Sequence, residues 1–189
     1  MGTYKAVKRT FFTVAHGEFV HRNKEGNVVD TFTGIDGVLV GLRVRNNRTE
    51  PDRKYTDFEL EDGGEHFVIS AGLYDSVSTT ILRCLAGVED FSKKILFEVR
   101  EVVGKDGKTH NNISLKQAGE RLQWCDIPDV EEFDLPTGER VKSTKKREDF
   151  INEVISKIQA RLGGNAAQDE GASADVDDMP EGDYKPNIQ

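Results

Sequence analysis

Apolar and polar residues alternate in five stretches between Gly37 and Lys116, as they do along β-strands that have one buried face. A further stretch, Tyr74–Leu85, changes to the period of a helix and lies between the third and the fourth strand, with Asp75 as its predicted N-cap. The five strand-like stretches are Gly37–Arg48, Lys54–Glu61, Glu65–Gly72, Lys94–Val103 and His110–Lys116.

Five strands with one helix between the third and the fourth predict the OB-fold, a mainly β, five-stranded barrel that usually binds oligonucleotides or oligosaccharides. Because side chains alternate along a strand, Arg43 and Arg45 are expected to point outward from the first strand. The residues of this strand that are expected to face the core are Val38, Val40, Leu42 and Val44.

The same pattern divides the rest of the chain into additions to this barrel. Residues 1–36 are interpreted as a basic arm followed by a β-hairpin made of Thr10–His21 and Val28–Thr33. The barrel spans residues 37–124, and residues 125–143 form a connecting segment with one candidate strand. Residues 144–162 contain an apolar stripe at helical spacing, which predicts an amphipathic helix over Lys145–Leu162.

The charge of the chain is concentrated at its end. Seven of the 34 acidic residues but only one of the 26 basic residues follow Leu162, so residues 163–189 carry −6 of the formal net charge of −8. This segment has few large apolar residues, which predicts a disordered acidic tail. The remaining 162 residues are close to neutral, so their basic side chains can gather on one face.

Catalysis finds little support in the sequence. His16 and His21 would lie on opposite faces of a strand, and Cys84 lies on the apolar side of the predicted helix. There is no GxSxG motif, phosphate-binding loop or CxxC motif. We therefore expect a protein that is not an enzyme and that has no cofactor or metal. Two cysteines and the lack of a long apolar run predict a cytoplasmic protein without a membrane span, in the host cytoplasm if the protein is viral.

Basic and aromatic residues occur where an OB barrel binds a strand of nucleic acid, which is across the second and third strands and along two flanking loops. Single-strand binders combine cations along a groove with flat rings on which bases stack. The candidate nucleic-acid-binding residues are Arg43, Arg45, Arg48, Arg53, Lys54, Tyr55, Phe67, Tyr74, Arg100, Lys105, Lys108 and Lys116. Taken singly, each cation is also an ordinary solvated charge.

The rings have structural interpretations beside the functional one. Phe67 lies in a strand that is apolar on both faces, so burial in the core explains it at least as well as stacking. Tyr55 alternates with acidic residues on the outward face and is the better stacking candidate. Trp124, the only tryptophan, is a weaker stacking candidate and is expected instead to attach the connecting segment to the barrel.

The stretches HFVISAGLYDSVSTTILRCLAG, KKILFEVREVVGKDGKTH and NNISLKQ follow one plan: an apolar strand, a helix, a strand of alternating charge, a Lys/Gly-rich hairpin tip and a closing strand. In this plan the chain resembles the single-stranded DNA-binding proteins of bacteria and their phages, over about residues 37–118. The added hairpin and the Lys145–Leu162 helix lie outside the usual bacterial plan and indicate a divergent, phage-encoded version.

The tail extends this resemblance. The family ends in an acidic segment, Asp-Asp-Asp-Ile-Pro-Phe, that recruits replication and repair proteins. This chain has a similar acidic motif, but it continues for nine further residues and lacks the terminal Phe. The resemblance implies a partner-binding tail that includes Asp175, Asp177, Asp178, Met179 and Pro180.

The sequence therefore predicts a protein that binds single-stranded DNA without sequence preference in replication, recombination or repair, and that recruits partners through its tail. The alternative is an OB-like barrel that serves as a protein-interaction or phage assembly module without affinity for nucleic acid. RNA binding on the same surface is a third reading. The sequence leaves open whether the protein forms a homo-oligomer.

Overall fold

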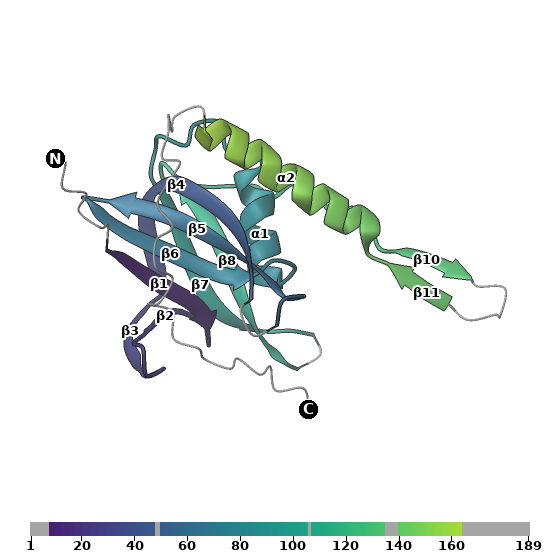
Figure 1. Ribbon diagram of the computed structural model, residues 1–189, viewed down its shortest axis with the longest axis horizontal. Coiled ribbons are helices and arrows are strands. Elements are labelled where there is room, and N and C mark those ends of the chain that lie inside the picture. The colour runs from purple at the N-terminus through teal and green to yellow at the C-terminus, as the bar shows by residue number, and fades with distance from the viewer. Residues whose placement is uncertain (1–7, 48–49, 106, 135–139, 164–189) are drawn as a thin grey trace.

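The computed structural model describes residues 8–47, 50–105, 107–134 and 140–163. Within these residues the chain is mainly β, with nine strands in one sheet that curls strongly into a half barrel and two helices that pack against it (Figure 1). The predicted mainly β, barrel-like class is confirmed at this level. The N-terminal seven residues of the basic arm and residues 164–189, predicted as the acidic tail, lie outside the described residues.

The middle of the sheet is an antiparallel meander of β4 (Gly34–Asn46), β5 (Lys54–Asp62) and β6 (Glu65–Gly72). Gly63 and Gly64 both have positive φ and form the turn between β5 and β6, as the Asp-Gly-Gly sequence predicts. β4 begins at Gly34, earlier than expected, because the glycines before Val38 continue the strand and pair with β7 instead of forming a corner.

A β-bulge between Leu39 and Gly41 changes which residues of β4 face the core. Leu39 and Leu42, on either side of the bulge, are both buried, whereas Val40 is exposed. The expectation that Val38 and Val40 point inward was therefore wrong, because the extra residue of a bulge shifts the alternation of the strand by one position. Val44, which was also expected in the core, is exposed near the end of β4.

The predicted helix is α1 (Ser76–Leu85), and it leads from β6 to β7 (Ile95–Val103). Asp75 is its N-cap, as predicted, but its side chain makes no capping hydrogen bond. β7 pairs antiparallel with the first residues of β4 and, over its whole length, with β8 (Thr109–Gln117). The element order from β4 to β8 is thus the predicted one.

The N-terminal segment forms three strands instead of the two expected. The stretch predicted as one strand, Thr10–His21, turns sharply at His16 and Gly17, which both have positive φ, and separates into β1 (Arg9–Ala15) and β2 (Glu18–Arg22). β3 (Val28–Phe32) then pairs with β2 at the edge of the sheet. β1 pairs in parallel with β6, so this segment is part of the main sheet.

The five strands from β4 to β8 do not close on one another within the described residues. Closure would pair β6 with β8, but the free edge of β6 pairs with β1 and that of β8 pairs with β9 (Glu120–Arg121). The turn between β1 and β2 reaches across to β8, where the Gly17 amide donates a hydrogen bond of 2.8 Å to Asn111 Oδ1. The N-terminal strands therefore fill the opening that the five strands leave.

One continuous hydrophobic core lies inside the curled sheet and under both helices. Phe19, Phe58 and Phe97 are fully buried there, on three different strands. The second predicted helix is α2 (Lys145–Gly163), and it packs its apolar stripe against β4 and α1. The stripe consists of Ile151, Val154, Ile155, Ile158 and Leu162.

The connecting segment contains a hairpin of two strands, β10 (Glu131–Asp134) and β11 (Arg140–Ser143), where one strand was expected. This hairpin extends beyond the N-terminal end of α2, away from the curled sheet (Figure 1). No helix of the described residues is long and apolar enough to cross a membrane.

Candidate nucleic-acid interface

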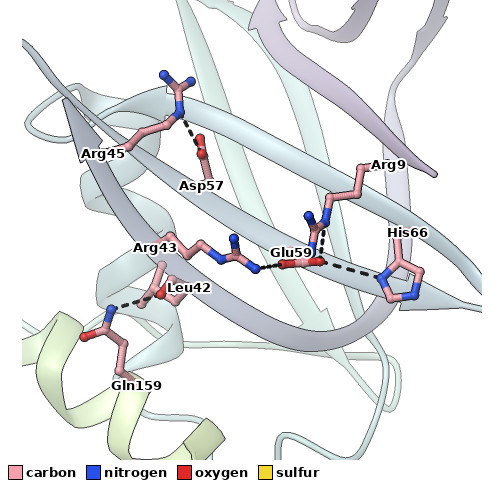
Figure 2. A network of polar contacts seen from close by, with 8 residues as sticks. All are labelled: Arg9, Leu42, Arg43, Arg45, Asp57, Glu59, His66 and Gln159. Atoms are coloured by element: carbon pink, nitrogen blue, oxygen red, sulfur yellow. Dashed lines mark hydrogen bonds and ion pairs between the residues drawn. The ribbon is translucent and has the colours of Figure 1, made fainter. Parts of the chain in front are cut away.

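A buried carboxylate lies at the centre of the outward face of β1, β4, β5 and β6 (Figure 2). Glu59 is only 8% exposed, and its Oε1 accepts a hydrogen bond of 2.7 Å from Arg9 Nε. Its Oε2 lies 3.3 Å from Arg43 Nη2, and His66 Nδ1 lies 3.7 Å from Oε1. Four strands thus contribute one side chain each to this cluster, which stabilises their packing at the sheet surface.

The bulge in β4 makes room for this carboxylate. Gly41 pairs with Glu59 across β4 and β5, and a Cβ added at Gly41 would lie 3.0 Å from Glu59 Oε2. A larger residue would therefore displace the carboxylate from its cationic neighbours. The end of α2 lies beside this point, because Gln159 Nε2 donates a hydrogen bond of 2.9 Å to the Leu42 carbonyl (Figure 2).

A second polar group lies farther along the same face. Arg45 Nε donates a hydrogen bond of 2.7 Å to Asp57 Oδ2, and Arg45 Nη2 donates one of 3.0 Å to Ser70 Oγ. Ser70 Oγ donates in turn to Asp57 Oδ1 at 2.6 Å. The three residues close a ring of hydrogen bonds across β4, β5 and β6, so the guanidinium group of Arg45 is held in one orientation.

The Arg45 guanidinium also lies over an aromatic ring at the end of the sheet. Its Cζ is 4.9 Å from the centre of the Tyr55 ring, and the Cζ of Arg53 is 5.4 Å from the same centre. Tyr55 pairs with Arg45 on β4 and with Gly72 on β6, so the ring lies on the outward face, as predicted. Two cations over one ring give this end of the sheet an aromatic and cationic surface.

An open hollow of about 530 Å³ adjoins Tyr55, between the β4–β5 loop and the start of α1. Tyr74 lines it and is 50% exposed. The pKa of Tyr74 is raised, chiefly by partial burial and further by Glu148 and Asp149 of α2. The other residues that line the hollow are Glu50, Asp52, Arg53, Lys54, Gly72, Leu73 and Asp75.

The second group of predicted cations lies on the β7–β8 hairpin. Arg100 is exposed on β7, and Lys105 and Lys108 are exposed near the hairpin tip. The β1–β2 turn packs against β7 here, since a Cβ added at Gly17 would lie 2.5 Å from the Glu101 nitrogen. β1 runs parallel to β6 toward the end of the sheet that holds Tyr55. The β1–β2 turn, and the β7–β8 hairpin that it contacts, therefore lie at the same end as Tyr55.

Three predicted residues do not join these groups. Phe67 pairs with Leu60 on the inward side and packs against the core, where its ring lies 6.2 Å from that of Phe12. Lys116 lies at the other end of β8 and forms an ion pair of 2.6 Å with Glu98. Arg48 lies outside the described residues.

The cations of the strand face differ from those of the loop and hairpin in how far carboxylates neutralise them. Arg9, Arg43 and Arg45 are paired with Glu59 or Asp57. In contrast, Lys54, Arg100 and Lys105 form no ion pair with any residue that the structure describes. The cations without an ion pair thus lie beside the β4–β5 loop and on the β7–β8 hairpin. On the strand face between them, carboxylates neutralise the arginines.

Asp57 and Glu59 are among the acidic residues that alternate with Tyr55 on the outward face, a pattern that is also typical of an ordinary solvated strand. Neither they nor Arg9 and Ser70 were among the predicted site residues. The available signal was the register of the predicted strands, which sets the arginines of the first strand opposite the carboxylates of the second. The contribution of Arg9 depends on the parallel pairing of β1 with β6, which no local pattern indicates.

The described residues contain no group of three or more His, Cys, Asp or Glu side chains arranged to hold a metal ion. No family model, curated protein or solved structure matches the chain.

Proposed function

We propose that this protein binds single-stranded DNA without sequence preference, on an OB-like barrel formed by β4 to β8. The order of these elements supports the OB-like assignment: a three-strand meander, a helix, and a hairpin whose first strand returns to β4. The N-terminal strands are then an insertion into the gap of the barrel, and their presence explains why β6 and β8 do not pair.

The observation that carries the proposal is the combination of rings and cations at one end of the sheet. Tyr55 lies under two guanidinium groups, and Tyr74 is half-exposed beside a hollow that Arg53 and Lys54 also line. Bases can stack on aromatic rings and on guanidinium planes, while lysines contact phosphates. Stacking accepts any base, so such a surface binds without sequence preference.

The ion pairs on the strand face give this surface a defined shape. Asp57 and Ser70 hold the Arg45 guanidinium over Tyr55, so this group does not lose side-chain freedom when a base stacks on it. Arg43 is 61% exposed and makes only a 3.3 Å contact with Glu59, which leaves it able to reach a phosphate. Arg9 stays with the buried carboxylate.

The proposal includes a role for the acidic tail in partner recruitment during replication, recombination or repair. It rests on the seven acidic residues of 163–189 and on the motif that contains Asp177, Asp178 and Pro180. A coating protein of this kind acts stoichiometrically, by covering single strands in the cytoplasm, which would be the host cytoplasm for a phage protein.

The experiment that tests the proposal compares two double charge reversals by the fluorescence anisotropy of labelled oligo-dT. Arg53→Glu with Lys54→Glu alters the proposed site. Lys93→Glu with Lys157→Glu is the control, because these lysines are more exposed than Arg53 but lie away from the proposed site, on the loop before β7 and on α2.

The first variant is expected to weaken binding at least about tenfold, to a similar extent for every base composition, since each lost phosphate contact removes a sequence-independent term. The control is expected to bind like the wild type. Equal affinities for both variants would refute this site. No binding by the wild type would favour the alternative, a protein-interaction module.

A further inference from the structure

Trp124 is half-exposed and follows β9, which pairs with the last residues of β8. Its ring lies near Arg83 at the end of α1. The Cζ of Arg83, in the last turn of α1, is 5.2 Å from the centre of the indole ring. Half of the Trp124 side chain remains exposed, which is unusual for a residue that anchors a segment.

Other groups attach this segment to the barrel. Arg83 Nε donates a hydrogen bond of 2.6 Å to the Cys125 carbonyl, and the Cys125 amide donates one of 3.3 Å to the Arg83 carbonyl. Leu122 and Ile127, on either side of Trp124, pack against the core. The indole is therefore held in position by its neighbours, and its own contact with Arg83 is only one of several that attach the segment.

The cations around the indole lack acidic partners. Neither Arg83 nor Arg121 forms an ion pair with a carboxylate of the described residues, unlike Arg9, Arg43 and Arg45 on the other face. Both guanidinium groups lie close enough to Cys84 to oppose the rise that burial causes in the pKa of its thiol. Arg83 lies over the indole ring, and Arg121 ends β9 three residues before Trp124, so both cations belong to the segments that flank the indole.

We infer that Arg83, Arg121 and Trp124, called here the Trp124 surface, form a second contact for the single strand. The indole stacks on a base, and the two guanidinium groups contact the neighbouring phosphates. This inference rests on the proposed function. A neutral hydrophobic docking surface for a protein would not need two uncompensated cations beside the ring.

The two contacts are far enough apart to separate short from long ligands. The Tyr55 end and the β9 end lie at opposite ends of the strands. Tyr55 pairs with Arg45 of β4, whereas β9 is in register with Gly37 of β4 through β7 and β8, three strands away around the sheet. Gly37 and Arg45 are eight residues apart in the sequence, which corresponds to about 25 Å of extended strand. A strand that uses both contacts must pass around the barrel, so only a long oligonucleotide reaches the Trp124 surface as well as the Tyr55 end.

The single tryptophan provides the test, because the intrinsic fluorescence of the wild type comes from Trp124. Oligo-dT of about 5 and about 30 nucleotides, near the lower limit and beyond the upper limit of about 4–16 nucleotides per OB fold, would be titrated with anisotropy and tryptophan emission recorded together. The long oligonucleotide is expected to quench the emission. Trp124→Ala is expected to weaken its binding by about 5-fold to 100-fold.

Two further variants distinguish the loss of the aromatic ring from the loss of any exposed apolar side chain. Trp124→Phe keeps a ring and is expected to lose less affinity than Trp124→Ala. Val29→Ala removes a similarly exposed apolar side chain from β3 and is expected to bind like the wild type. Circular dichroism and thermal unfolding of each variant would establish that it is folded.

The outcomes separate this inference from the proposed function. Binding of the long oligonucleotide with unchanged tryptophan emission, and equal affinity of Trp124→Ala and the wild type, would overturn the Trp124 surface alone. Absence of any anisotropy change with either oligonucleotide would overturn the proposed function and the inference with it.

Discussion

Glu59 shows how single residues on the strand face depend on one another. A carboxylate that is mostly removed from water is stable only when cations and hydrogen-bond donors compensate it. Arg9 provides the shortest contact, and Gly41 leaves the space that the carboxylate occupies. Since the partners come from β1 and β4, this residue links the N-terminal strands to the meander.

Glu59→Gln is expected to lower the free energy of unfolding by about 2 kcal/mol, because the change leaves the Arg9 guanidinium with a neutral acceptor. Arg43→Ala is the control, since this side chain is largely exposed and its loss is expected to cost less than about 1 kcal/mol. Urea unfolding at neutral pH measures both values. A Glu59→Gln variant as stable as the wild type would show that the cluster does not stabilise the fold.

The buried thiol of Cys84 is expected to make the stability of the protein depend on pH in the alkaline range. Burial raises the pKa of its thiol, although Arg121 and Arg83 act in the opposite direction. Above the pKa of an exposed thiol, about 8.5, the unfolded chain loses this proton while the folded chain keeps it. The unfolded state then binds fewer protons, so stability falls as the pH rises through this range.

Cys84→Ala is therefore expected to show a smaller loss of unfolding free energy between about pH 8 and about pH 10 than the wild type shows. The loss of buried side-chain volume in Cys84→Ala lowers the unfolding free energy equally at every pH, so comparing how steeply this free energy falls with pH in the two proteins removes that contribution. The raised pKa of Tyr74 adds a similar effect at higher pH in both proteins. Parallel pH profiles for the two proteins would contradict the predicted shift.

At the scale of elements, the turn between β1 and β2 determines how the N-terminal strands are placed. Gly17 has a φ of 75°, and its Cα lies directly against the β7 backbone near Glu101. Only glycine combines this backbone conformation with so close an approach. The turn thereby holds β1 and β2 in the gap between β6 and β8.

Gly17→Ala is expected to destabilise the protein by more than Gly26→Ala. Both glycines have positive φ, but a Cβ at Gly26 would have no neighbour within 4 Å. Gly26→Ala should then cost only the backbone term of about 1–2 kcal/mol, while Gly17→Ala adds a clash with β7. Thermal unfolding of the two variants measures the difference. Equal losses of stability would mean that β7 moves to accommodate the new Cβ at position 17 without a loss of stability.

The elements that the sequence predicts well are those with a strong local period. The meander, both helices and the β7–β8 hairpin follow from alternation, helical spacing and Gly-containing turns. The bulge at Gly41 and the turn at His16 and Gly17 were missed because each inserts an irregularity inside an otherwise regular apolar pattern. The parallel pairing of β1 with β6 joins distant segments, and no local signal encodes it.

As with the elements, the local features of the candidate site could be predicted from the sequence, but its contacts between distant residues could not. The outward orientation of Arg43, Arg45 and Tyr55 followed from strand alternation. Their neutralisation by Asp57 and Glu59 requires the register between strands, and the exposure of Trp124 requires the tertiary packing of an irregular segment. Sequence patterns thus indicate which face a residue occupies better than they indicate its partners.

At the scale of the whole molecule, charge is separated along the chain. The body is close to neutral and pairs most cations of its strand face, whereas residues 163–189 carry −6. A strongly acidic segment attached to a protein that binds a polyanion competes with that ligand for the same cations. The competition should be strongest where screening is weakest.

Removal of residues 164–189 is accordingly expected to raise the affinity for oligo-dT several-fold at about 20 mM salt and to have little effect at about 300 mM, because the Debye length shortens with salt. The measurement is a pair of anisotropy titrations of the full chain and the truncated chain at each salt concentration. An unchanged affinity at low salt would exclude the tail as a competitor.

The most direct test of the central claim is the salt dependence of oligo-dT binding by the unmodified protein. Binding is expected at low salt. The logarithm of the association constant should fall linearly with the logarithm of the salt concentration, with a slope of about −0.7 for each phosphate contacted. Similar affinities are expected for oligonucleotides of different base composition. Absence of binding at about 20 mM salt, where electrostatic attraction is strongest, would contradict the central claim.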